Sequence, residues 1–130
     1  MKSMFFASLM MLGLNAFAAG TDCTKEENFP QISKAELQQK LDEKAVFLVD
    51  VNGTKSYTKA HVPTAVDYAT TKATFAKTLP AEKSALVVAY CGGPSCGAWK
   101  TAATEACKLG YTNVKHFKEG IKGWTATAKN

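Results

Sequence analysis

Arginine is absent from this chain of 130 residues, and all 16 of its basic side chains are lysines. Most phosphate sites and nucleic acid readers rely on arginine, because its planar guanidinium donates two parallel hydrogen bonds. The lysines are scattered along the chain, and the formal net charge is only +5. We therefore expect a solvated basic surface and no nucleic acid partner.

Histidine and cysteine are scarce as well, with 2 histidines and 4 cysteines in the chain. No cluster of them has the spacing of a zinc site, because the pair Cys91 and Cys96 lacks a second pair nearby. We therefore expect no bound metal, and nothing in the sequence indicates a cofactor. Four cysteines are also too few to staple a miniprotein, so the core is expected to be mostly hydrophobic.

One long apolar run is present, over residues 4–14. It is short for a membrane span, and it follows the positive charge of Lys2. The small-x-small pattern Ala16-Phe17-Ala18 comes next, which is typical of a signal peptidase site. We expect residues 1–19 to be a signal peptide that is removed on export to a bacterial periplasm or out of the cell. The mature protein would then have no contact with the membrane.

The remaining chain is long enough for one domain. Residues 20–29 are polar and irregular and are expected to form a flexible N-terminal tail, whereas residues 30–130 are expected to form the domain. All four cysteines lie after the cleavage site, and thiols in an oxidising compartment tend to pair. The sequence does not choose among the three complete pairings. Cys23, in the tail, is the cysteine most free to form a structural or intermolecular bond.

Strand and helix patterns alternate along the domain. Continuous apolar runs over 45–50 and 85–90 predict strands buried on both faces, and 65–69 and 114–117 predict brief strands. The patterns between them predict helices: one capped by Ser33, then 55–60, 71–79, 98–109 and 120–128. This alternation predicts an α/β domain with a parallel sheet.

A loop of small residues joins the strand over 85–90 to the helix over 98–109. Its residues are Cys91, Gly92, Gly93, Pro94, Ser95, Cys96 and Gly97. A loop between a strand and a helix N-terminus gathers backbone N–H groups around one point. Such groups stabilise a thiolate, which is the nucleophilic form of cysteine. The loop therefore predicts sulfur chemistry at Cys91, with at most five N–H donors because Pro94 has none.

Several blocks of the sequence, in this order and spacing, resemble the rhodanese domain family. They are Val46-Phe47-Leu48-Val49-Asp50-Val51, Tyr57, Ala60-His61-Val62-Pro63-Thr64-Ala65, Val87-Val88-Ala89-Tyr90-Cys91, Ala102-Ala103, Leu109-Gly110-Tyr111, Asn113-Val114 and Glu119-Gly120-Ile121-Lys122-Gly123-Trp124. The resemblance covers roughly residues 30–128. It implies a three-layer α/β domain with a five-stranded, mostly parallel sheet and helices on both faces. It also implies a six-residue active-site loop that begins with the catalytic cysteine, here Cys91.

The function that this resemblance implies is sulfur transfer. Cys91 would take a sulfane sulfur from a small donor, hold it as a persulfide in the loop, and pass it to a thiol or cyanide-like acceptor. A protein thiol is a further possible acceptor, and we expect a monomer. Many active members carry a basic residue in the loop, which is uncharged here, so Lys100 is the nearest candidate for an anion contact. The family usually has arginine at the position of Asn52. These departures weaken the case for thiosulfate as the donor more than the case for a reactive Cys91.

Cys96 has two readings, as a small packing residue or as a resolving thiol. A wrapped loop would bring it within disulfide distance of Cys91, and the bond would switch off sulfur transfer. Two other functions stay open for the chain. One is a periplasmic thiol–disulfide redox protein that uses Cys91 and Cys96, and the other is a non-catalytic rhodanese module that binds a protein.

The other polar or sulfur-bearing candidates are assigned structural roles. His61 is expected to be hydrogen-bonded in a turn, His116 to lie at the surface, and Asp50 to pin a loop. Trp99 is expected to pack in the core, and Cys107 to be a buried small hydrophobe.

Overall fold

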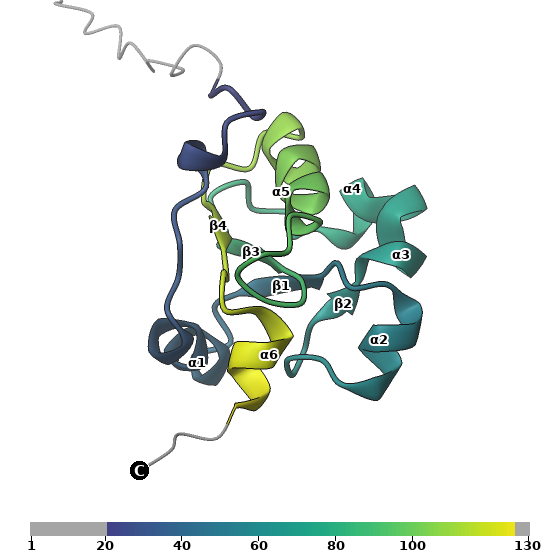
Figure 1. The fold of residues 1–130 in the computed structure, drawn as a ribbon. Helices are drawn as coiled ribbons and strands as arrows, with labels where there is room; N and C mark the ends of the chain where they lie inside the picture. Colours follow the sequence, from purple (N-terminus) through teal and green to yellow (C-terminus); the bar gives the residue numbers. More distant parts are fainter. Residues whose placement is uncertain (1–20, 127–130) are drawn as a thin grey trace, which may run out of the picture.

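The computed structural model describes residues 21–126, so the predicted signal peptide lies outside the described residues. Parallel strands form one sheet at the centre of this part of the chain (Figure 1). They are β1 (Phe47–Asp50), β2 (Val66–Asp67), β3 (Val87–Tyr90) and β4 (Val114–His116), in the order β2-β1-β3-β4. The two apolar runs form the central strands β1 and β3, since such runs need cover on both faces. No helix in residues 21–126 is long and apolar enough to cross a membrane.

The sheet has four strands within the described residues, and the expected fifth is reduced to one bridge between Gln31 and His116. His116 donates its N–H to the Pro30 carbonyl at 2.9 Å and accepts at its own carbonyl from Ile32 N–H at 3.0 Å. Pairing ends there because Pro30 has no N–H to donate. It also ends because Ser33 starts a helix by accepting from Glu36 N–H.

Helices cover both faces of the sheet, which confirms the predicted three layers. One face carries α3 (Tyr68–Thr71), α4 (Phe75–Thr78) and α5 (Trp99–Lys108), and the other carries α1 (Lys34–Asp42), α2 (Thr54–Lys59) and α6 (Gly120–Thr125). The strand residues alternate between the two cores. In β3, Val87 and Ala89 join the core under α5, whereas Val88 and Tyr90 join the core under α1 and α6.

The helix expected over 71–79 is interrupted. The chain forms α3, a 3₁₀ turn over Lys72–Thr74, and then α4. Asp67 caps α3 by accepting from Ala69 N–H, and the Thr71 hydroxyl donates back to the Asp67 carbonyl. Threonine side chains that bond to nearby backbone compete with a continuous helix, which explains the break.

The segment before the domain is attached to it, in contrast to the flexible tail expected for 20–29. A disulfide joins Cys23 to Cys107 of α5 across 84 residues of sequence. Phe29 is 5% exposed and packs edge-on against Trp99. The prediction that Cys107 is a buried small hydrophobe is therefore wrong, because Cys107 is only partly buried and its sulfur is bonded to Cys23 of this segment.

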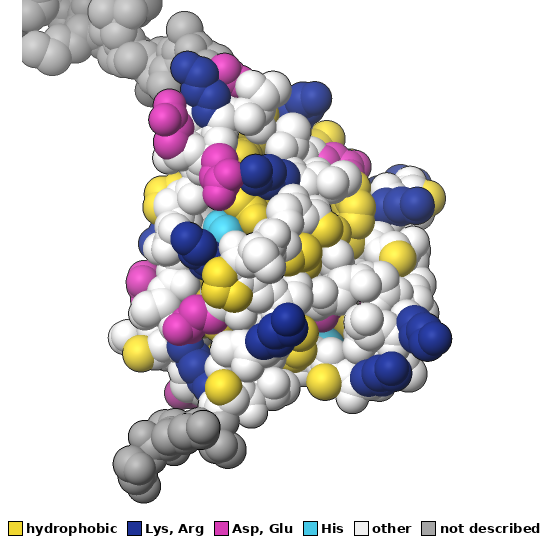
Figure 2. Space-filling view, in the orientation of Figure 1, with side chains coloured by type: hydrophobic (Ala, Val, Ile, Leu, Met, Phe, Trp, Pro, Cys, Tyr) yellow, Lys and Arg dark blue, Asp and Glu magenta, His cyan; other side chains and the backbone are white. Residues whose placement is uncertain are grey.

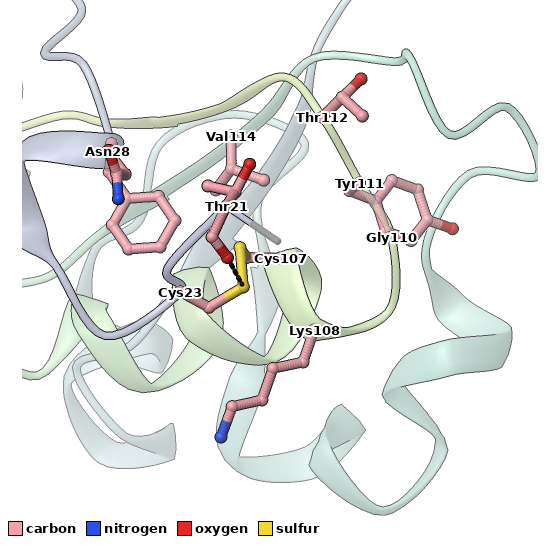
Figure 3. A pocket seen from close by; sticks show the side chains of 10 residues that line it. Thr21, Cys23, Asn28, Cys107, Lys108, Gly110, Tyr111, Thr112 and Val114 are labelled. Atoms are coloured by element: carbon pink, nitrogen blue, oxygen red, sulfur yellow. Dashed lines mark hydrogen bonds between the residues drawn. A yellow bond between two sulfur atoms is a disulfide. The ribbon is translucent and has the colours of Figure 1, made fainter. Parts of the chain in front are cut away.

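A pocket surrounds the Cys23–Cys107 bond (Figure 3). Its lining combines the N-terminal segment, through Asn28 and Phe29, with the end of α5 and the start of β4. None of the residues that line it belongs to the Cys91–Gly97 loop.

His116 is buried rather than at the surface, which corrects the sequence prediction. It is 4% exposed, and its ring stacks on Trp99 with centroids 3.6 Å apart. It is covered because the bridge to Gln31 lays the N-terminal segment along β4. Burial lowers the pKa of His116 to about 4, which outweighs the opposite effect of Glu26.

This burial predicts a loss of stability in mild acid. Below about pH 6.5 the unfolded chain binds a proton at His116, whereas the folded protein resists protonation down to about pH 4. The free energy of unfolding should therefore fall by about 3 kcal/mol over that window because of this one group. Urea unfolding of the wild type and of His116→Phe at pH 7 and pH 4 measures the difference. An equal pH dependence in both proteins would contradict it.

Candidate active site

Cys91 directly follows β3, at the carboxyl edge of the sheet. The Val51 N–H, just after β1, donates to the Tyr90 carbonyl at 2.8 Å, so the ends of β1 and β3 are joined beneath the cysteine. Ligands of open parallel α/β sheets bind beyond this edge. The predicted nucleophile therefore lies where the topology favours a site.

The loop after Cys91 curls back and closes with a disulfide between Cys91 and Cys96. The Cys96 N–H donates to the Gly93 carbonyl at 3.0 Å, and this turn brings the two cysteine Cα atoms to 6.2 Å. Figure 1 shows the loop between β3 and α5, beside α6. Cys91 is 2% exposed, whereas Cys96 is only partly buried. Cys96 is thus the more accessible residue of the pair.

Free N–H groups remain in the closed loop. Within residues 21–126, those of Gly92, Gly93, Ser95 and Gly97 donate to no acceptor. Four donors are therefore left, one fewer than the sequence allowed, because the turn uses the Cys96 N–H. Unpartnered N–H groups in a loop that begins at a cysteine are available to a thiolate or persulfide anion.

The start of α6 is hydrogen-bonded to the start of the loop. The N–H groups of Ile121 and Lys122 donate to the carbonyls of Cys91 and Gly92 at 2.9 Å and 3.1 Å. Gly120 makes this approach possible, since a Cβ there would lie 2.6 Å from the Cys91 oxygen. Gly120 also has a φ of +62°, a region that favours glycine. The block Glu119-Gly120-Ile121-Lys122-Gly123-Trp124 carries part of the resemblance, but no local pattern in it predicts this contact with the loop.

Replacing Gly120 with alanine is expected to destabilise the protein by about 2–4 kcal/mol, through backbone overlap added to the cost of the positive φ. Gly110→Ala is a matched control, because Gly110 has a φ of +96° but no atom within 4 Å of a built Cβ. Urea unfolding should show the smaller loss for Gly110→Ala. Equal losses of unfolding free energy in the two variants would mean that the close contact between Gly120 and the loop adds nothing to the cost of the substitution.

Asp50 and His61 have structural roles, as the sequence predicted. Asp50 is fully buried, accepting from the Tyr90 hydroxyl at 2.6 Å and from Asn52 N–H at 2.8 Å. Burial and this bond to Asp50 raise the pKa of Tyr90, so its hydroxyl stays a donor. His61 Nδ1 lies 2.8 Å from the Tyr57 carbonyl, and the two rings stack.

The basic residue placed against the loop is Lys122 rather than Lys100. Lys100 Nζ lies 2.7 Å from Glu26 Oε2, so its charge is paired with the N-terminal segment. By contrast, a Cβ built on Gly93 would lie 3.4 Å from Cδ of Lys122. In Figure 2 the surface over the loop is uncharged, with lysines and acidic side chains around its border. Lys122 was missed because it lies 25 residues beyond Gly97 in the sequence, and only the fold brings it beside the loop.

Asn52 also lies at this edge of the sheet. A Cβ built on Gly92 would lie 3.6 Å from Asn52 Oδ1. Its Nδ2 is buried and has no hydrogen-bond partner within the described residues. The rhodanese family usually has arginine at this position. This chain therefore has an amide there, whose N–H donor is unused and lies beside the loop.

A model of the rhodanese-like domain matches residues 33–127. The chain belongs to the rhodanese-like domain family. Among solved structures, the BH2092 protein of Bacillus halodurans is 26% identical with a TM-score of 0.59, over 75% of this chain and 72% of that one. The human single-domain sulfurtransferase TSTD1 is 18% identical with a TM-score of 0.59, over 75% and 98%. A thiosulfate sulfurtransferase from Pseudomonas aeruginosa is 19% identical with a TM-score of 0.63, over 77% of this rhodanese-like chain and 19% of that one. No curated protein sequence matches it.

Proposed function

We propose that this rhodanese-like protein is a sulfurtransferase in which Cys91 carries the sulfur. Its thiolate attacks the sulfane sulfur of a small donor and holds it as a persulfide, which a thiol or cyanide-like acceptor then removes. The observation that carries the proposal is the position of Cys91, after β3 and at the start of a loop with four unused N–H groups. The human relative named as a sulfurtransferase has the same fold, which supports it.

The disulfide between Cys91 and Cys96 sets the condition for this activity. In the closed loop the Cys91 sulfur is bonded and cannot attack a donor, so transfer requires reduction first. We propose that this bond regulates the enzyme, and that the apolar N-terminal run directs it to the periplasm or out of the cell. In that compartment the bond can form and persist. The acceptor there is a small thiol or a protein thiol, and the protein acts as a monomer.

The test is sulfur transfer by the reduced protein. It is incubated with thiosulfate or inorganic polysulfide, cyanide is added, and thiocyanate is measured. We expect thiocyanate with at least one donor, and less of it from protein that was not reduced. No thiocyanate with either donor, together with an unmodified Cys91 by intact mass, would refute the proposal.

A second function is favoured by one observation, the Cys91–Cys96 bond itself. A thiol–disulfide redox protein would use this pair to exchange electrons with dithiol partners. Cys96→Ser separates the two functions, because sulfur transfer needs only Cys91, whereas dithiol exchange needs both residues.

A further inference from the structure

The two cysteines of the loop differ in exposure and in surroundings. Cys91 is 2% exposed at the end of β3, whereas Cys96 is partly exposed at the far end of the turn. The turn between Cys96 N–H and the Gly93 carbonyl holds their Cα atoms 6.2 Å apart, and their Sγ atoms are bonded. The Cys96 sulfur therefore reaches the inner sulfur of any persulfide formed on Cys91.

We propose that Cys96 is a resolving thiol that converts the Cys91 persulfide to free sulfide, so that the protein also acts as a sulfane-sulfur reductase. This inference rests on the proposed function, because it begins with the persulfide. The Cys96 thiolate attacks Sγ of Cys91, and the bond between the two Sγ atoms forms. The bond from Cys91 Sγ to the outer sulfur breaks, and its electron pair leaves with that sulfur as hydrosulfide. The sulfane sulfur is reduced, and the two cysteines are oxidised to the disulfide seen in the structure.

The chemistry of the closed loop also indicates how it reopens. The electrons come from a dithiol reductant, whose thiolate attacks the sulfur of Cys96, the less buried of the two cysteines. Cys91 is then the leaving thiolate, and the free N–H groups of the loop stabilise it, which favours this direction of attack. The second thiol of the reductant displaces Cys96 and restores both thiols. Over one cycle, a sulfane sulfur and a dithiol become hydrosulfide and a disulfide.

The test follows one turnover of the full mature protein without oxygen. The protein is reduced, freed of reductant and treated briefly with inorganic polysulfide, and the excess is removed. We expect the wild-type mass to change from the persulfide to the disulfide form while one equivalent of sulfide appears. Cys96→Ser should keep the added sulfur and release no sulfide until an external thiol is supplied. Cys96→Ala should behave in the same way, which excludes an effect of the serine hydroxyl.

A matched control removes the other pair of cysteines. Cys23→Ser/Cys107→Ser leaves the loop intact and should release sulfide as the wild type does, because that disulfide lies at α5 rather than in the loop. If the wild type keeps its persulfide as long as Cys96→Ser does, the inference is wrong and the proposed function stands. If no variant that retains Cys91 ever gains sulfur, the proposed function itself fails. Circular dichroism of each variant confirms that a loss is not due to unfolding.

Discussion

Replacing Cys91 with serine is expected to lower thiocyanate formation by more than about a thousandfold, whichever sulfane donor is used. The serine oxygen is of similar size but forms no persulfide, so the sulfur has no covalent carrier. The buried position after β3 tolerates the change, since Cys91 is 2% exposed and serine loses only a small apolar contact. Initial rates of thiocyanate formation by the reduced proteins measure the effect.

Cys96→Ser is the matched control for this prediction. Both variants lose the loop disulfide and both gain one hydroxyl, so they differ only in which sulfur remains. Cys96→Ser should retain thiocyanate formation, and it should no longer need prior reduction. Comparable loss of activity in the two variants would contradict a special role for Cys91.

Removing the Cys23–Cys107 disulfide is expected to cause the largest loss of stability. The bond closes 84 residues of sequence, and the loop-entropy model gives about 4.5 kcal/mol for a loop of that size. Cys23→Ser/Cys107→Ser should therefore unfold at a lower urea concentration, with a loss of about 2–5 kcal/mol. The bond also holds the segment that covers His116, so amide exchange should rise at Phe29 and along β4.

Cys91→Ser/Cys96→Ser provides the comparison for that loss. Its disulfide spans only 5 residues of sequence, for which the same model gives about 2 kcal/mol. We expect the double variant at Cys23 and Cys107 to be the less stable of the two by urea unfolding. The opposite order would show that the N-terminal segment contributes little to the folded state.

The regular elements could be predicted because their patterns are local. The apolar runs gave β1 and β3, and the strong helical pattern over 98–109 gave α5 at Trp99–Lys108. Cys91 and the loop of small residues could be placed for the same reason, since a strand followed by glycines and a helix is contiguous in sequence. The capping role of Ser33 is equally local.

The features that sequence reasoning missed depend on contacts between distant segments. The pairing of Cys23 with Cys107 and the burial of His116 both follow from the N-terminal segment lying along β4 and α5. Glu26 of the same segment forms an ion pair with Lys100, so the Lys100 ammonium group is paired there and not with an anion at the loop. The role of Gly120 appears only when α6 is packed against the loop. No short pattern in the sequence indicates these long-range contacts.

The most direct test of sulfur transfer through Cys91 is the intact mass of reduced Cys96→Ser after brief exposure to inorganic polysulfide, followed by peptide mapping. This variant cannot close the loop disulfide, so the intermediate accumulates. We expect the added mass of one sulfur atom, located on the peptide that contains Cys91 and lost when cyanide is added. No added sulfur, or sulfur located on Cys23 or Cys107 instead, would contradict it.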